Sequence, residues 1–259
     1  MQKKYFYFTT LLFISISMLT SCRTMQLNQD GKTLGKGVYE SAAGGGVGIV
    51  GGAMSTTCLA MNINAEFQQR FGIGERTEVQ LKVHNDFTAS GGYYYTFAFS
   101  QQNEIDFAVK INTYDKNGYA FSLLPFGGTA FGMSNHGIPP KNYFVIPTGE
   151  NSSLLSYVCP NTGLALIGSK SGLKYNFYWG GTFNLSPSIW HLVFGAPAFE
   201  TDFTFNWGWE IPKDRIVYRH EIDLFCQINW MGVPFINFGL SYHFSAGVRY
   251  NPGQRQMRE

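Results

Sequence analysis

Hydrophobic and polar residues alternate with a period of two along most of this chain. The alternation is clearest in residues 59–68, 78–84, 105–112, 203–210 and 236–244. Because successive side chains of a β-strand point to opposite faces, each segment predicts a strand with one apolar and one polar face. No segment shows the spacing of an amphipathic helix, so the pattern predicts an all-β fold.

Turn-forming residues separate the alternating segments and predict hairpins. They lie at Gly72–Glu75, Gln101–Asn103, Lys116–Gly118 and Pro212–Asp214. The longest loop is expected at Gly132–Gly149, and further breaks are expected at Pro160–Gly163 and Leu185–Ser188. At about 20 residues for each strand and turn, the chain can form about 10–12 strands, and an even number is typical of closed outer-membrane barrels.

The chemistry of the polar face decides between two kinds of barrel. A soluble, lipocalin-like periplasmic barrel with an apolar ligand inside would expose Lys and Glu to water. Here the polar positions hold mainly Asn, Gln, Ser, Thr and small residues, charged residues are only 14% of the chain, and aromatic residues are 17%. This composition favours an antiparallel transmembrane-type β-barrel with a polar lumen and aromatic girdles. The lumen is expected to be lined by Glu66, Glu78, Lys82, Asp106, Lys110, Glu221 and Asp223.

The first 22 residues have the organisation of an export signal. Lys3 and Lys4 precede the uncharged apolar run Tyr5–Met18, and Leu19–Cys22 follows it. This tetrapeptide resembles the lipobox of bacterial lipoproteins. The resemblance implies that residues 1–21 are removed and that Cys22 carries a diacylglycerol and an acyl chain such as palmitate. Arg23, in place of the Asp that retains enterobacterial lipoproteins at the inner membrane, implies an outer-membrane location. A simple secretory signal that happens to contain a cysteine is the alternative.

The remainder divides into three parts. Residues 22–36 form an aperiodic polar stretch that is expected to tether the lipid to the fold, residues 37–250 form the barrel, and residues 251–259 form a C-terminal tail. The last alternating segment resembles the β-signal of outer-membrane barrels, although about fifteen residues follow it. The matching positions are Asn237, Gly239, Tyr242 and Phe244. The resemblance implies recognition by the barrel-assembly machinery.

Net charge and motif spacing exclude several functions. Removal of residues 1–21 takes away two lysines and no acid, so 19 basic and 17 acidic residues become 17 and 17, which gives no electrostatic basis for nucleic-acid binding. The five histidines have no metal-ligand spacing. Gly46–Gly51 matches the form GxGxxG, but no helix is predicted after it, so it does not indicate a dinucleotide site. We expect no metal and no cofactor.

One segment resembles a catalytic motif. His243 and Ser245, followed by Asn251–Gly253, resemble the His-x-Ser-Asn and Asn-Pro-Gly motifs of outer-membrane lipid A deacylases, in which Ser is the nucleophile and His its base. The Asn after the serine is replaced by Ala246, and Glu259 is the only later acid. The sequence therefore favours a lipid-anchored outer-membrane barrel that contacts membrane lipid and has no catalytic residues. Such a barrel is expected to act as a narrow pore for a small solute or lipid, or as a surface structure. The deacylase is the alternative.

Overall fold

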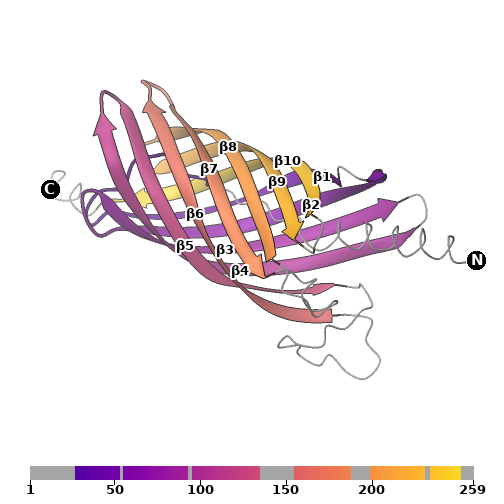
Figure 1. The fold of residues 1–259 in the computed structure, drawn as a ribbon. Helices are drawn as coiled ribbons and strands as arrows, with labels where there is room; N and C mark the ends of the chain where they lie inside the picture. The colour runs from indigo at the N-terminus through magenta and orange to yellow at the C-terminus, as the bar shows by residue number, and fades with distance from the viewer. Residues whose placement is uncertain are drawn as a thin grey trace, which may run out of the picture.

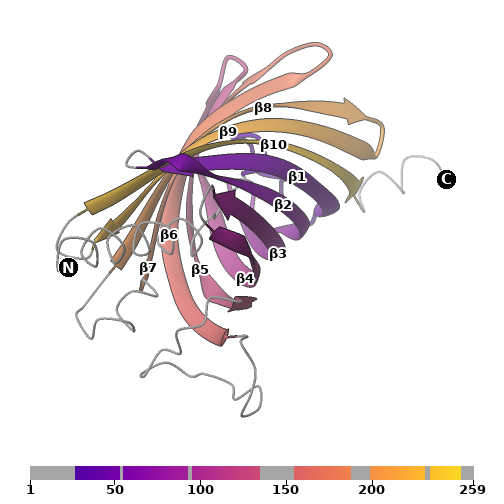
Figure 2. The ribbon, with the colours of Figure 1, turned by 90° about the vertical axis from the view of Figure 1, so that its right-hand side faces the viewer.

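The chain forms a closed antiparallel barrel in the computed structural model, which describes residues 27–52, 55–92, 95–134, 155–187, 199–230 and 234–251 (Figures 1 and 2). The strands are β1 (Tyr39–Gly52), β2 (Ser55–Gly72), β3 (Thr77–Gly92), β4 (Tyr95–Lys116), β5 (Tyr119–Ser134), β6 (Leu155–Ser171), β7 (Asn176–Pro187), β8 (Phe199–Lys213), β9 (Ile216–Trp230) and β10 (Pro234–Tyr250). Each pairs with its neighbours in sequence, and β1 pairs with β10 to close the wall. The predicted all-β, antiparallel barrel is confirmed, with ten strands.

The two faces of the wall are chemically opposite. Phe107, Phe205 and Leu240 point outward and are 65%, 54% and 55% exposed, whereas Arg219 and Glu221 point inward and are fully buried. A soluble barrel of this size would fill its interior with apolar side chains and expose its charges. This barrel is therefore of the transmembrane type, with an apolar surface suited to lipid.

No helix in the described part of the chain is long and apolar enough to cross a membrane.

Four short hairpin turns lie at one end of the barrel, which we call the turn end. They join β2 to β3, β4 to β5, β6 to β7 and β8 to β9, and β1 begins and β10 ends beside them, on the left of Figure 1. The predicted turn at Lys116–Gly118 is present, and both Asn117 and Gly118 have positive φ, as a two-residue type I′ hairpin requires. The predicted turn after Gly72 is also present.

Two predicted breaks are wrong. Gln101–Asn103 lies within β4, which runs unbroken for 22 residues, and Asn103 accepts a hydrogen bond from Asn85 on β3. Pro160–Gly163 lies within β6, where a Cβ at Gly163 would approach the ring of Phe126 to 2.2 Å. Polar residues and glycine resemble turn signals, but they also suit a wall with a polar inner face.

Parts of the remaining loops lie outside the described residues. β5 continues to Ser134, so the first residues of the loop expected at Gly132–Gly149 belong to a strand, and the rest are not described. Leu185 belongs to β7, and Ser188 is not described.

Candidate functional site

The segment before β1 lies inside the barrel rather than outside it. We call Leu27–Gly37 the plug segment; its first five residues, Leu27–Gly31, are buried. Residues 27–31, which belong to the stretch 22–36 expected to tether the lipid to the fold, are therefore packed inside the barrel. A polar segment without periodicity can be buried here because the inner wall supplies hydrogen-bond partners.

The first residues of the plug segment bind to a carboxylate of β9. Glu221 accepts hydrogen bonds from the backbone N–H groups of Leu27 at 2.8 Å and Asn28 at 2.7 Å. Asn28 adopts the left-handed conformation, with φ of 44°, and its side-chain amide donates to Glu66 on β2. Leu27 packs in a small apolar cluster with Leu124 and Ile167. Two strands that are far apart in sequence, β2 and β9, thus both hold Asn28.

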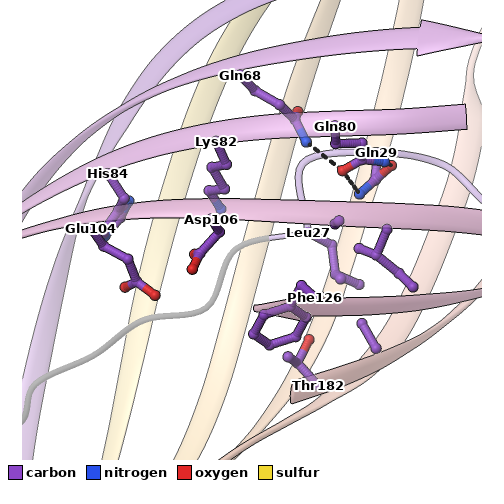
Figure 3. Close-up of a pocket in the computed structure, with 13 residues that line it drawn as sticks. Leu27, Gln29, Gln68, Gln80, Lys82, His84, Glu104, Asp106, Phe126 and Thr182 are labelled. Atoms are coloured by element: carbon purple, nitrogen blue, oxygen red, sulfur yellow. Dashed lines mark hydrogen bonds between the residues drawn. The ribbon is translucent and has the colours of Figure 1, made fainter. Parts of the chain in front are cut away.

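The middle of the plug segment is held by side chains from β3, β4 and β5. Lys110 donates to the carbonyl oxygens of Asp30 at 2.5 Å and Lys32 at 2.6 Å. Ser122 donates to the carbonyl of Gly31 at 2.6 Å, and a Cβ at Gly31 would lie 2.7 Å from a backbone oxygen of β5. Gln29 exchanges side-chain hydrogen bonds with Gln80 (Figure 3). The carbonyls of Asp30, Gly31 and Lys32 thereby accept hydrogen bonds from side chains of the wall.

The last residues of the plug segment, Gly35–Gly37, pack closely against the turn end of the barrel. Gly35 and Gly37 have φ of 84° and 78°, which glycine adopts without strain. Gly37 donates its N–H to the carbonyl of Gly72 at 2.7 Å. A Cβ on Gly72 would lie 1.8 Å from the carbonyl oxygen of Gly35. The backbone of β2 can approach the plug segment this closely because Gly72 has no side chain, and glycine at position 35 allows the positive φ of the segment there.

Ion pairs surround the lower plug segment on the inner wall. We define the charged belt as Glu40, Arg70, Glu78, Glu210, Arg219 and Arg249. At its centre Glu40, on β1, accepts hydrogen bonds from Arg219 at 2.7 Å, Arg249 at 2.8 Å and Arg70 at 3.2 Å. Arg70 also makes a bidentate pair with Glu78, and Arg219 bonds to Glu210. The belt therefore links strands β8, β9, β10, β1, β2 and β3 across the seam where the barrel closes.

The inner wall outside the charged belt is rich in acids. Among the described residues, the buried carboxylates there are Glu66, Asp86, Glu104, Asp106, Asp202, Glu221 and Asp223. Two described lysines share this part of the wall: Lys110, which binds the plug segment, and Lys82, which pairs with Glu66 at 3.0 Å. An excess of carboxylates in a low-dielectric wall favours cations in the space between them.

All seven residues that we expected to line the lumen point inward. Glu66, Glu78, Lys110 and Glu221 contact the plug segment, which the sequence did not suggest. The others meet neighbours on the wall: Lys82 pairs with Glu66, Asp106 accepts from Asn161, and Asp223 accepts from Asn206. Sequence reasoning missed the roles of Glu40 and Glu210, whose only signal is their place on a polar strand face.

The described residues of the β-signal resemblance lie on both faces of β10. Tyr242 and Phe244 point outward and are exposed, whereas Gly239 faces inward, where a Cβ would lie 2.0 Å from the ring of Phe225. Asn237 pairs in register with Gly52 of β1, and its side chain lies outside the described residues, as does the whole of Cys22.

The geometry of His243 does not match a catalytic triad. Its Nε2 lies 2.9 Å from both Asp223 Oδ2 and Ser241 Oγ, whereas a triad needs acid and nucleophile on different ring nitrogens. In the described part of the structure, His243 Nδ1 and Ser245 Oγ have no hydrogen-bond partner. Both side chains are fully buried in the lumen, away from the outer surface that meets lipid. This arrangement does not support a lipid A deacylase.

The glycine-rich motif forms the inner face of β1. Gly44, Gly46 and Gly48 point into the barrel, and a Cβ at Gly46 would lie 2.2 Å from Nδ1 of His243. The glycines therefore make room for the inward side chains of β10. No group of three or more metal-ligating side chains is present among the described residues.

The chain is similar to several solved outer-membrane proteins at low sequence identity. No family model matches the chain, and no curated protein matches it. The translocator domain of the autotransporter NalP from Neisseria meningitidis is 9% identical, with a TM-score of 0.44 and coverage of 96% of each chain. The outer-membrane protease OmpT from Escherichia coli is 7% identical, with a TM-score of 0.42 and coverage of 89% of this chain and 99% of the protease. An outer-membrane channel from Pseudomonas putida F1 is 9% identical, with a TM-score of 0.43 and coverage of 88% of this chain and 100% of the channel.

Proposed function

We propose that this protein is a non-enzymatic outer-membrane β-barrel, attached in addition by a lipid on Cys22, that provides a narrow passage for small cations. The plug segment holds this passage closed. The observation that carries the proposal is the docking of Leu27 and Asn28 on Glu221 inside the lumen. The apolar outer face, with its exposed aromatic side chains, supports the membrane location.

Two features of the lumen support passage rather than a permanently filled core. The plug segment is held by hydrogen bonds and one small apolar cluster, so it can leave without breaking the barrel wall. The wall that it would uncover is polar, and outside the charged belt its seven buried carboxylates outnumber the two lysines, Lys82 and Lys110, among the described residues. Such a lumen would carry cations in preference to anions.

Conductance in planar lipid bilayers tests this function. Wild-type protein is expected to stay closed for most of the recording, whereas a variant lacking residues 27–36 is expected to conduct and to favour K⁺ over Cl⁻. Glu75→Gln, at an exposed turn, is the matched control and should behave like wild type. The heat-dependent mobility of each variant in SDS gels reports whether the barrel has formed.

A surface-structural role predicts a different result. If the plug-deletion variant forms a heat-modifiable barrel and still does not conduct, the passage is refuted and the structural role takes its place. Conduction that favours Cl⁻ would refute the assigned cation preference.

A further inference from the structure

Lysines and aromatic side chains alternate in one row on the outer face of the wall, near the turn end. The row crosses β4, β5, β6 and β7, whose hairpins stand side by side in Figures 1 and 2. Lys116, Tyr119, Lys170 and Phe177 pair in register in this order, and Tyr119 and Phe177 are exposed on the outer face. Paired residues of neighbouring strands point to the same face, so both lysines of the row also face outward.

The protein does not neutralise the positive charge of this face. Three lysines contribute to it: Lys116, Lys170 and, in the turn between β6 and β7, Lys174, and all three are exposed. Among the described residues, the lysines that form ion pairs are Lys82 and Lys110 of the inner wall. The three outer lysines are therefore available to an external anion.

The acid next to Lys116 belongs to the opposite face. Asp115 pairs in register with Ala120, which is buried on the inner side of the wall, whereas Lys116 pairs with Tyr119. The ammonium of Lys170 lies 5.2 Å from the centre of the Tyr119 ring. This cation–π contact places the ammonium beside the aromatic surface and leaves its charge uncancelled.

The next row, toward the middle of the barrel, is aromatic. The rings of Tyr114, Phe121 and Trp179 follow one another, and the ring centres in each successive pair are 6.0 Å apart. A Cβ at Gly168, which lies between Phe121 and Trp179 in register, would be 2.6 Å from the indole of Trp179. The indole therefore lies directly against the backbone of β6. Phe177 stacks on it at 5.8 Å and joins the two rows into one surface.

Aliphatic side chains form the row after that. Leu123 of β5 and Leu166 of β6 pair in register and are 37% and 56% exposed. The outer face thus changes from cationic to aromatic to aliphatic between the turn end and the middle of the barrel. A glycerophospholipid changes in the same order, from its phosphate through its glycerol esters to its acyl chains. Aromatic rings are favoured at the level of the esters and headgroups.

We propose that this face binds one anionic glycerophospholipid. Its phosphate is held by Lys116, Lys170 and Lys174, and its acyl chains run over Trp179 toward Leu166. Short turns of outer-membrane barrels face the periplasm, so the lipid comes from the leaflet on that side. A headgroup with an ammonium of its own would bring a like charge to the lysines, which favours a headgroup of net negative charge. The site depends on the membrane location of the barrel and is independent of the passage.

The other turns lack this charge pattern. The turn between β6 and β7 has two lysines and no acid within residues 170–175. By contrast, Glu75 precedes Arg76 in the turn between β2 and β3, and Asp214 lies between Lys213 and Arg215 in the turn between β8 and β9. The preference for an anion is therefore assigned to the face around Lys170.

Native mass spectrometry of the purified full-length protein, released from detergent micelles, tests the site. The protein is incubated with dioleoyl phosphatidylglycerol or with dioleoyl phosphatidylethanolamine, which carry the same acyl chains. We expect one phosphatidylglycerol to be retained, with a lipid-bound fraction at least fivefold larger than that for phosphatidylethanolamine. Glycerol 1-phosphate, which has the anionic head without acyl chains, is expected not to be retained.

Variants locate the binding. Lys170→Gln with Lys174→Gln is expected to lower the phosphatidylglycerol-bound fraction at least fivefold and to leave the phosphatidylethanolamine-bound fraction unchanged. Lys213→Gln with Arg215→Gln removes the same positive charge from another exposed turn of the same end, and this control should retain lipid like wild type. The heat-dependent mobility of each variant in SDS gels reports whether the barrel has formed.

Four results would overturn the proposal. They are equal retention of the two lipids by wild type, retention of glycerol 1-phosphate at the level of the lipid, unchanged retention in the Lys170 and Lys174 variant, and equal loss in both double variants. The first two comparisons use wild-type protein alone, so they stand even if a variant does not fold. Conductance of the plug-deletion variant is measured separately, so failure of the lipid site and failure of the passage are distinguishable.

Discussion

Single carboxylates organise the interior of this barrel by accepting several donors each. Glu221 binds two backbone amides of the plug segment and the side chain of Asn206, and Glu40 binds three arginines. Buried charges are stable only when they are paired and hydrogen-bonded, so each of these acids supports groups that would otherwise be unsatisfied.

Glu221 gives a direct test of how the plug segment is held. A hydrogen bond contributes about 0.5–1.5 kcal/mol net, and Glu221→Ala removes the two that Leu27 and Asn28 donate. We expect faster hydrogen–deuterium exchange in a peptide covering residues 27–37, measured by mass spectrometry. Glu75→Gln should leave exchange in this peptide unchanged. Equal protection in Glu221→Ala and wild type would show that other contacts are sufficient.

Cys22 gives a test of the lipid anchor. The lipobox resemblance predicts that Cys22→Ser abolishes metabolic labelling with palmitate and leaves the signal uncleaved by the lipoprotein peptidase. Acyl chains contribute about 0.8 kcal/mol for each buried methylene, so two or three chains make release from the membrane negligible. Undiminished labelling of Cys22→Ser, with Cys226→Ser as the control, would disprove the anchor.

At the scale of elements, glycine positions decide how closely the plug segment and the wall approach. Gly72 on β2 has Gly35 as its nearest neighbour, whereas the nearest atom to a Cβ at Gly74 would be 3.9 Å away. These two positions, in the same hairpin, differ in whether a methyl group meets the plug segment.

Gly72→Ala is therefore expected to displace the lower plug segment, while Gly74→Ala is not. The result would be seen as faster hydrogen–deuterium exchange of the amides of residues 35–38. The new methyl group would displace the carbonyl of Gly35, which accepts a hydrogen bond from Val38, and Gly37 donates to the carbonyl of Gly72 itself. If Gly74→Ala had the larger effect, the steric explanation would fail.

The two faces of β4 give a second prediction at this scale. Phe107 is 65% exposed on the outer face, and Ala108 lines the inner cavity. An arginine facing the middle of the bilayer costs about 2–4 kcal/mol, and much less when it faces a polar lumen. Phe107→Arg should therefore lower the yield of heat-modifiable barrel more than Ala108→Arg does, with Phe107→Leu as the conservative control. The reverse order would indicate that the outer face does not meet lipid.

At the scale of the whole molecule, the charged belt joins strands from both sides of the seam. Glu40→Gln leaves Arg70 and Arg219 buried with a weaker partner, and breaking a buried ion pair costs about 3–5 kcal/mol. We expect a lower urea midpoint for loss of the folded gel band. Glu75→Gln should keep the wild-type midpoint, and a Glu40→Gln midpoint equal to it would show that the belt does not stabilise the barrel.

The sequence was sufficient for the fold because the alternation of apolar and polar residues reports directly on the two faces of each strand. Phe107 and Asp106, for example, could be assigned to opposite faces from their positions alone. Local composition gave a wrong prediction where polar residues suit both a turn and the inner face of a strand: Gln101–Asn103 has the composition of a turn, yet it lies within β4.

The site could be predicted only in part. The inward acids of the wall follow from strand register, but docking of the plug segment depends on a contact between residues 194 positions apart, Leu27 and Glu221. Nothing in the aperiodic run Leu27–Asp30 indicates burial, because its partners become neighbours only when the barrel closes. The pocket that Leu27, Glu104 and Phe126 line has the same origin, since six strands, β2 to β7, and the plug segment contribute to it.

The position of the plug segment has a consequence for the order in which the barrel is assembled. The segment directly precedes β1, it lies inside the barrel, and Glu78 of the belt accepts a hydrogen bond from its Leu34. If Cys22 carries its lipid before insertion, a chain end of that bulk cannot be threaded through a finished cylinder. The segment must then be laid against β3, β4 and β9 while the cylinder is still open, and the zippering of β1 onto β10 becomes the last step of folding.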